Sequence, residues 1–170
     1  VTLSVRGTVA TQSSWLENAF LSMTPANGTI TPEAGFSFSY HLADNPRAAV
    51  HSGWLIGMAY LQRDMLPKID SLTALGYHNF IVSGHSQGGA LSYLITSHFY
   101  YLKRAGRFPV EVNFKTYCSA APKPGNLYYA YDFEHITAGG WAFNVVNSAD
   151  WVPEVPATVQ TTADINRTSP

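Results

Sequence analysis

The stretch that decides the fold reads Asn79-Phe-Ile-Val-Ser-Gly84-His-Ser86-Gln-Gly88-Gly-Ala-Leu91. Residues 80–82 form a short apolar run of residue types common in strands, which predicts a buried strand. The small residues after it lead into a helical pattern. Between the two, Gly84-x-Ser86-x-Gly88 has the spacing of a nucleophile elbow, a tight strand-to-helix turn that exposes a serine hydroxyl. An ordinary glycine-rich turn would share these glycines, but the flanking strand and helix favour the elbow. We therefore expect Ser86 to be a nucleophile.

Composition excludes several classes of protein. The chain has 170 residues, enough for one domain with one core, of which 46% are hydrophobic and only 12% charged. A net charge of −1 and the lack of any Lys/Arg run argue against a nucleic-acid partner. No apolar run is long enough to predict a transmembrane segment. Cys118 is the single cysteine, so it predicts neither an internal disulfide nor a cysteine-based metal site, and no cofactor or metal is implied.

The pattern on both sides of the elbow alternates strands with helices. We expect an opening strand over 1–5, a long irregular connection over 22–46 with one short strand at 36–40, a helix over 51–75, and a second helix that ends near 106. Further strands are expected over 110–119 and 141–147, the second of them buried, with an aromatic helix over 128–135 between them. This alternation predicts a single α/β domain, residues 1–170, with a central and mostly parallel sheet.

A short amphipathic helix is expected over residues 11–23, because Trp15 and the apolar residues around it recur at helical spacing. Two interpretations stay open at this point. The helix could pack permanently on the core, or it could be a movable cover over an apolar pocket.

Acyl transfer by a serine needs more than the serine. A histidine must take the proton, a carboxylate must orient that histidine, and hydrogen-bond donors must face the oxyanion. Asp150 follows the strand over 141–147 and precedes Pro153 and Pro156, which stiffen the turn; it is therefore expected at the same sheet edge as Ser86. The backbone N–H of Gln87 is one oxyanion donor by construction of the elbow. Thr8, after the opening strand, is a candidate for the second.

Several blocks, taken in order, resemble the class 3 lipases, the family of the fungal triacylglycerol lipases. They are Val5-Arg-Gly-Thr8, Trp15, Val50-His-Ser-Gly-Trp54, Gly84-His-Ser-Gln-Gly-Gly-Ala-Leu91, Ala121-Pro-Lys-Pro-Gly-Asn126 and Val146-Asn-x-x-Asp150-x-Val-Pro153-x-x-Pro156. The resemblance implies an α/β-hydrolase-type three-layer sandwich. It also implies that Ser86 is the nucleophile, Asp150 the triad acid, and Thr8 with the N–H of Gln87 the oxyanion hole. Residues 11–23, with Trp15, would be a lid helix that opens at a lipid surface.

Two departures from the family pattern stand out. The family usually has leucine where this chain has Gln87, a tolerable change because only the backbone takes part. The second departure is the catalytic histidine, which in the family follows the acid, whereas no histidine follows Asp150 here. A structural interpretation exists for each of the six histidines, His41, His51, His78, His85, His98 and His135. His135 is the one that stays open as a candidate for the base. We therefore expect the core of a longer lipase, incomplete at both ends.

The expected function is hydrolysis of carboxylic ester bonds in lipids through an acyl-enzyme, by a triacylglycerol lipase or carboxylesterase of the Ser-Asp-His type acting at a lipid–water interface. Phospholipase A1, galactolipase and feruloyl esterase activities share the scaffold and stay open. A second or separate chain could supply the histidine, or the protein could be a lipid-binding pseudoenzyme or an inactive fragment. A secreted or extracytoplasmic location is favoured by the resemblance alone, and the oligomeric state is not indicated.

Overall fold

The computed structural model describes residues 1–9, 18–19 and 22–155. Its centre is a four-stranded parallel sheet with the strand order β1-β6-β7-β8. The strands are β1 (Thr2–Val5), β6 (Asn79–His85), β7 (Asn113–Ser119) and β8 (Ala142–Val145). The elbow strand β6 therefore lies inside the sheet, with β1 and β7 on its two sides.

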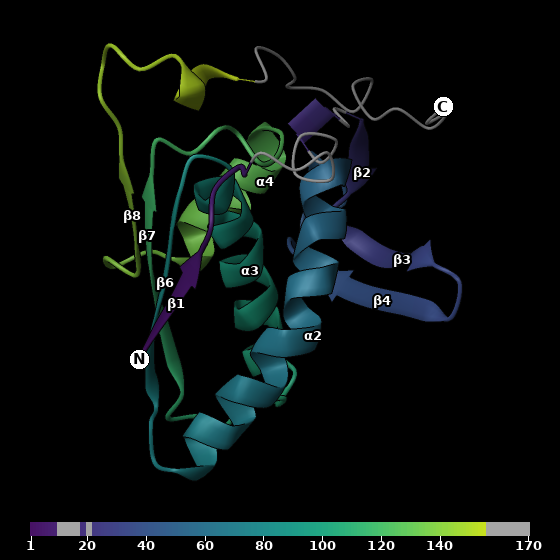
Figure 1. Cartoon of the computed structure of the whole chain (residues 1–170), viewed down its shortest axis with the longest axis vertical. Helices are drawn as coiled ribbons and strands as arrows, with labels where there is room; N and C mark the ends of the chain where they lie inside the picture. The colour runs from purple at the N-terminus through teal and green to yellow at the C-terminus, as the bar shows by residue number, and fades with distance from the viewer. Residues whose placement is uncertain (10–17, 20–21, 156–170) are drawn as a thin grey trace.

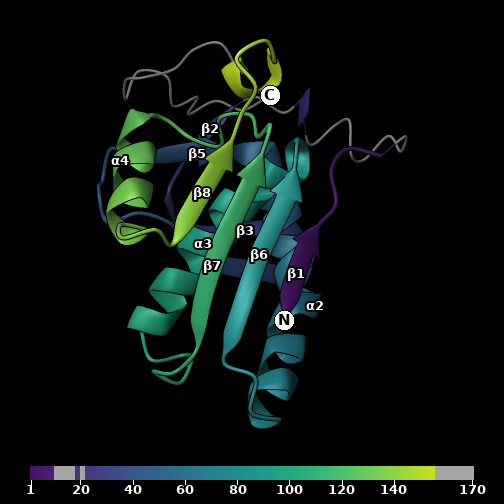
Figure 2. The same cartoon turned by 90° about the vertical axis from the view of Figure 1, so that its left-hand side faces the viewer.

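Three helices pack on one face of this sheet: α2 (Ser52–Ala74), α3 (Gln87–Arg104) and α4 (Leu127–Ile136). Figure 1 shows the sheet nearly edge-on with the helices on one side, and in Figure 2 the strands lie in front of the helices. α3 lies directly against the sheet, and its residues Leu94, Ile95 and Phe99 are fully buried. The α/β architecture with a mostly parallel sheet thus agrees with the sequence prediction.

The side-chain alternation of β6 explains why one face is covered and the other open. Phe80 and Val82 point to the helices and are at most 1% exposed, whereas Ile81 between them is 39% exposed. On the open face, Tyr117 of β7 stacks on Phe143 of β8 with ring centroids 5.4 Å apart. Within the described residues no helix covers this face, so the third layer of the expected sandwich is not formed there.

The region between β1 and α2 holds more regular structure than the sequence predicts. β2 (Met23–Pro25) pairs with β5 (Ala49–His51), and β3 (Asn27–Glu33) forms an antiparallel hairpin with β4 (Phe36–His41). Only β4 was expected, in an otherwise irregular connection over 22–46, so that prediction is wrong. The β3 strand has no apolar run because it is largely exposed, so its sequence carries no strand signal.

Other boundaries differ in informative ways. Met23 lies in β2, so the expected helix over 11–23 does not extend that far, and Trp15 lies outside the described residues. Val110 lies before β7 and is 79% exposed, so the strand expected from 110 begins only at Asn113. The strand over 141–147 was expected to be buried, yet β8 is mostly exposed. It pairs only with β7 among the described strands, and β-branched and aromatic residues favour edge strands as well as buried ones.

The helix termini follow sequence signals closely. α2 ends before Gly76, whose φ of 90° is the left-handed conformation that glycine adopts without steric cost. Asn126 caps α4 by accepting a hydrogen bond from the backbone N–H of Tyr129 at 3.1 Å. The expected aromatic helix is therefore present, and Tyr129 is 1% exposed, in agreement with a core role for part of its aromatic face.

Candidate active site

Ser86 stands at the junction of β6 and α3 in a conformation that non-glycine residues rarely adopt. Its φ is 57° and its ψ is −128°. Only two described non-glycine residues have positive φ, the other being Ala120 in the loop after the neighbouring strand β7. Such strain persists only where the surrounding structure enforces it, and it is typical of functional positions. The turn presents the half-buried Ser86 at the carboxyl edge of the sheet.

Glycines around Ser86 let three backbone segments converge. A Cβ on Gly88 would overlap the carbonyl oxygen of Val5, so the start of α3 touches the end of β1. A Cβ on Gly7 would lie 2.9 Å from the carbonyl oxygen of His85. The segment that follows β1, and with it Thr8, is thereby brought next to the elbow.

The two candidate oxyanion donors, Gln87 and Thr8, lie on segments next to the elbow. Gln87 is the first residue of α3, directly after Ser86, and is 3% exposed, so its backbone N–H lies at the positive end of the helix dipole. Thr8 lies beside the turn on the β1 side. Both candidate donors therefore lie on segments that adjoin Ser86, and oxyanion stabilisation requires that they converge on one oxygen.

Thr8 is held by two residues that the sequence analysis did not single out as catalytic. The Asn18 side-chain amide donates from Nδ2 to Thr8 Oγ1 at 2.9 Å. The Asn18 carbonyl Oδ1 accepts from the indole Nε1–H of Trp54 at 3.0 Å. No sequence pattern links residues 8, 18 and 54, because they are far apart in the chain and meet only in the folded structure.

Trp54 is itself fixed by His51. The His51 ring is fully buried, caps α2 by accepting from the Trp54 backbone N–H at Nδ1 (3.3 Å), and stacks on the indole at 3.9 Å. Burial lowers the pKa of His51 to about 4, and the backbone carbonyl of Asn18 opposes this shift only in part. Nε2 of His51 has no hydrogen-bond partner of good geometry. The ring is therefore neutral at pH 7, and its role is structural, as the sequence suggested.

Asp150 lies beyond β8, in a turn that leads into the short 3-10 helix η1 (Val152–Glu154). Its Oδ1 accepts from the Val152 backbone N–H at 3.0 Å, and its own N–H donates to Asn147 O at 3.0 Å. Lys123 in the loop after β7 binds this segment, donating its backbone N–H to Val155 O at 2.8 Å and its Nζ to Glu154 Oε2 at 3.3 Å. These bonds hold the Asp150 turn at the same carboxyl edge of the sheet as Ser86 (Figure 1).

The match to known proteins covers nearly the whole chain. The family model described as Lipase (class 3) matches residues 2–160. The chain belongs to the class 3 lipase family. It is 32% identical over 111 residues to lipases of Rhizopus niveus and Rhizopus oryzae, a stretch that is 64% of this chain and 27% of each relative.

Solved lipase structures share this fold. The lipase of Rhizopus microsporus var. chinensis superposes with a TM-score of 0.59 at 30% identity, over 91% of this chain and 47% of that one. Lipase II of Rhizopus niveus gives 0.58 at 27% identity, over 91% of this chain and 51% of that one. The α/β-hydrolase fold is therefore confirmed, and the chain spans about half of these class 3 lipase structures.

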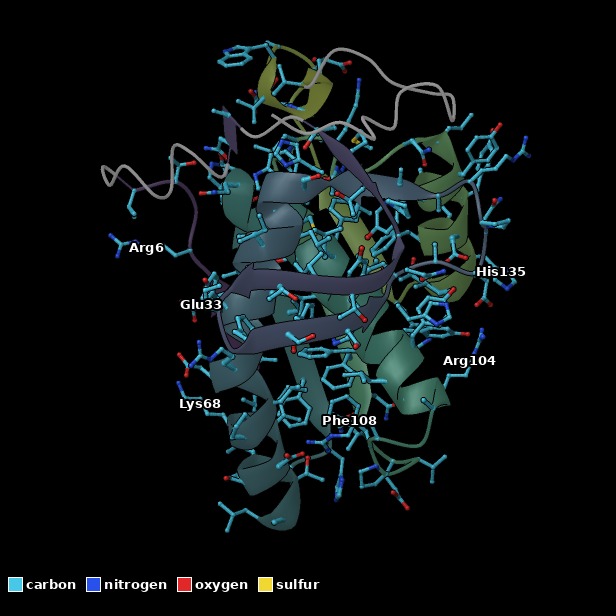
Figure 3. All side chains as sticks on the ribbon, turned by 90° about the vertical axis from the view of Figure 1, so that its right-hand side faces the viewer. Arg6, Glu33, Lys68, Arg104, Phe108 and His135 are labelled. Atoms are coloured by element: carbon cyan, nitrogen blue, oxygen red, sulfur yellow. The ribbon has the colours of Figure 1, made fainter. Side chains whose placement is uncertain are left out.

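None of the six histidines hydrogen-bonds to Ser86 in the part of the chain that the structure describes. His85 is exposed: it occupies the open face of the sheet, where Nδ1 lies 3.0 Å from Ser119 Oγ. Figure 3 labels His135 on the side of the molecule opposite Arg6, whereas the start of α3 contacts Arg6. His135 is thus remote from the elbow. His41 faces Asp44 at 3.0 Å, and His98 is buried against Phe38.

Among the described residues, no group of three or more His, Cys, Asp or Glu side chains is placed to hold a metal ion. Among them, too, no helix has the length and apolar character to cross a membrane.

Proposed function

We propose that the natural protein containing this chain is a serine hydrolase that cleaves carboxylic esters of lipids through an acyl-enzyme. Ser86 attacks the ester carbonyl, and Asp150 orients the histidine base. The backbone N–H of Gln87, together with the N–H and hydroxyl of Thr8, donates hydrogen bonds to the oxyanion. The observation that supports this most strongly is the strained φ of 57° at Ser86, at the junction of a central strand and a helix. Membership of the lipase family supports the ester as the bond that is cleaved.

A lipid substrate is supported by the surface near Asp150. Val145, Val146 and Trp151 expose 62%, 52% and 71% of their surface at the end of β8 and in the turn after it. Exposed apolar side chains grouped at one edge favour contact with an apolar partner. With a net charge of −1, the chain has no strong charge to select an ionic substrate. We place triacylglycerol and simple carboxylic esters ahead of phospholipid and feruloyl esters for this reason.

The catalytic histidine is the one triad residue that this chain does not provide. Each of the six histidines has another position or partner, so we propose that the catalytic histidine comes from residues outside this sequence, in the same polypeptide. A histidine from a second chain and a lipid-binding pseudoenzyme are the alternatives.

Labelling with a fluorophosphonate tests the nucleophile, because the probe reacts only with an activated serine. We expect the natural protein to be labelled on Ser86, and Ser86→Ala to abolish labelling and ester hydrolysis. Ser83→Ala is the matched control: Ser83 lies on the same strand three residues earlier and should leave both signals intact. An unlabelled natural protein that still binds long-chain esters would support the pseudoenzyme, and concentration-dependent activity would support a second chain.

A further inference from the structure

Trp54 lies at the end of a chain of hydrogen bonds whose direction is determined by chemistry. An indole Nε1–H can only donate, whereas a side-chain amide donates from its NH₂ and accepts at its oxygen. The 3.0 Å contact with Trp54 Nε1 therefore requires that Asn18 present Oδ1 to the indole. The Asn18 NH₂ must then face the other way, toward Thr8.

This orientation decides what the Thr8 hydroxyl can do. Because the Asn18 NH₂ is a donor, Thr8 Oγ1 must accept in the 2.9 Å contact between them. The hydroxyl hydrogen of Thr8 is then left for a different acceptor. We propose that Trp54 is a positioning residue for the oxyanion hole: by fixing the amide orientation of Asn18, its indole N–H keeps the Thr8 hydroxyl as a donor toward the oxyanion formed at Ser86. This inference rests on the proposed function.

The surroundings of Trp54 suit this role. The indole is 3% exposed and stacks on the fully buried ring of His51 at an interplanar angle of 17°. A ring packed in this way cannot turn its N–H elsewhere, and a buried N–H without a partner is costly. A flipped Asn18 amide would set two donors against each other at Trp54 and would draw the Thr8 hydrogen toward Oδ1. The rigid donor therefore excludes the unproductive orientation.

The decisive experiment is a double-mutant cycle in the natural protein, with kcat and KM measured on a soluble p-nitrophenyl ester. Trp54→Phe retains the buried ring but removes the N–H, so that the Asn18 amide can flip. We expect kcat to fall about 3- to 10-fold with KM unchanged, since only a fraction of molecules keeps the productive hydroxyl. Thr8→Val removes the hydroxyl and retains the backbone N–H, with an expected loss of about 100-fold in kcat. In the Thr8→Val background, Trp54→Phe should cause no further loss.

Asn18→Asp tests the direction of the chain with an isosteric change. A carboxylate can still accept from Trp54, but it can only accept from Thr8 as well, so it would take the hydroxyl hydrogen away from the oxyanion. We expect a loss in kcat of the same order as in Thr8→Val, about 100-fold. Trp141→Phe, at the opposite end of the sheet and 45% exposed, is the matched control for loss of an indole and should leave kcat unchanged.

The outcomes separate this inference from the function on which it rests. A natural protein without esterase activity or serine labelling would overturn the proposed function and the inference together. If Thr8→Val is impaired but Trp54→Phe has normal kcat, the inference alone fails. Equal losses from Trp54→Phe in the natural protein and in the Thr8→Val variant would also overturn it, because the effect would then arise from general damage to the elbow rather than from the hydroxyl.

Discussion

Gly84 and Gly88 approach each other so closely that a Cβ on Gly84 would overlap the backbone carbonyl of Gly88. This contact packs the last residues of β6 against the first turn of α3, and it forces the sharp turn that raises Ser86. The same Cβ would also lie 2.7 Å from Ser92 Oγ. The elbow is therefore a steric consequence of two glycines whose neighbours are backbone atoms that cannot move aside.

Replacing Gly84 with Ala should destabilise the protein by about 3 kcal/mol or more, since the methyl group meets backbone and not a flexible side chain. Urea unfolding measures the change. Gly106→Ala is the control: Gly106 has a φ of 79° with no atom within 4 Å of an added Cβ, so it reports backbone strain alone, about 1–2 kcal/mol. Equal losses at the two positions would contradict the steric account.

Asp150→Asn should lower kcat by about four orders of magnitude if Asp150 orients the base. The amide oxygen can still accept from the Val152 N–H, so the turn should persist and thermal stability should change little. Glu154→Gln is the control, because Glu154 is a neighbouring carboxylate that pairs with Lys123 instead. Near-normal ester hydrolysis by the Asp150→Asn protein would remove Asp150 from the triad.

Asn126→Ala should lower the free energy of unfolding by about 2–4 kcal/mol, as expected for a buried polar network that loses one partner. Asn126 is 1% exposed; its Oδ1 accepts from the backbone N–H groups of Ala49 and Tyr129 at 3.1 Å, and its Nδ2 donates to Arg47 O at 2.9 Å. Asn126→Asp retains the acceptors but replaces the donor with a buried carboxylate that faces the Arg47 carbonyl, so chemical denaturation should show a loss for this variant too. An unchanged free energy of unfolding in Asn126→Ala would show that this network does not stabilise the fold.

The free energy of unfolding should fall as the pH is lowered from about 6.5 to 4. Burial lowers the pKa of His98 to about 4, as it does that of His51, whereas an unfolded chain takes up these protons near pH 6.5. The stabilisation by the neutral rings is therefore complete above pH 6.5 and is lost as the pH falls through 4, by roughly 3 kcal/mol for each ring over the interval.

Denaturant unfolding of His98→Phe at pH 7 and pH 5 checks this dependence. The variant should show a smaller loss between the two pH values than the natural protein. His135→Gln, at an exposed position, is the control and should retain the full dependence. An unchanged slope in His98→Phe would show that His98 does not titrate in this interval on unfolding.

The elbow was readable in advance because it is local. Gly84, Ser86 and Gly88 lie within five residues, and strand and helix patterns flank them, so a single window of sequence holds the whole signal. The helices expected over 51–75 and 128–135 agree with α2 and α4 to within one residue at each end, because apolar periodicity is also a local signal. The β3 strand and the exposure of β8 were not, because a polar strand has no periodic signal and burial depends on what covers the sheet.

The sequence by itself determined the α/β fold and the candidate nucleophile, because periodicity and glycine spacing act over a few residues. The lipase family was readable as a resemblance, carried by several sequence blocks in a fixed order. Tertiary structure alone decided the neighbourhood of Thr8. Asn18 and Trp54 lie 36 residues apart, and only the tertiary structure places the indole Nε1 3.0 Å from the Asn18 amide oxygen. Long-range hydrogen bonds of this kind depend on three-dimensional approach, which no local pattern encodes.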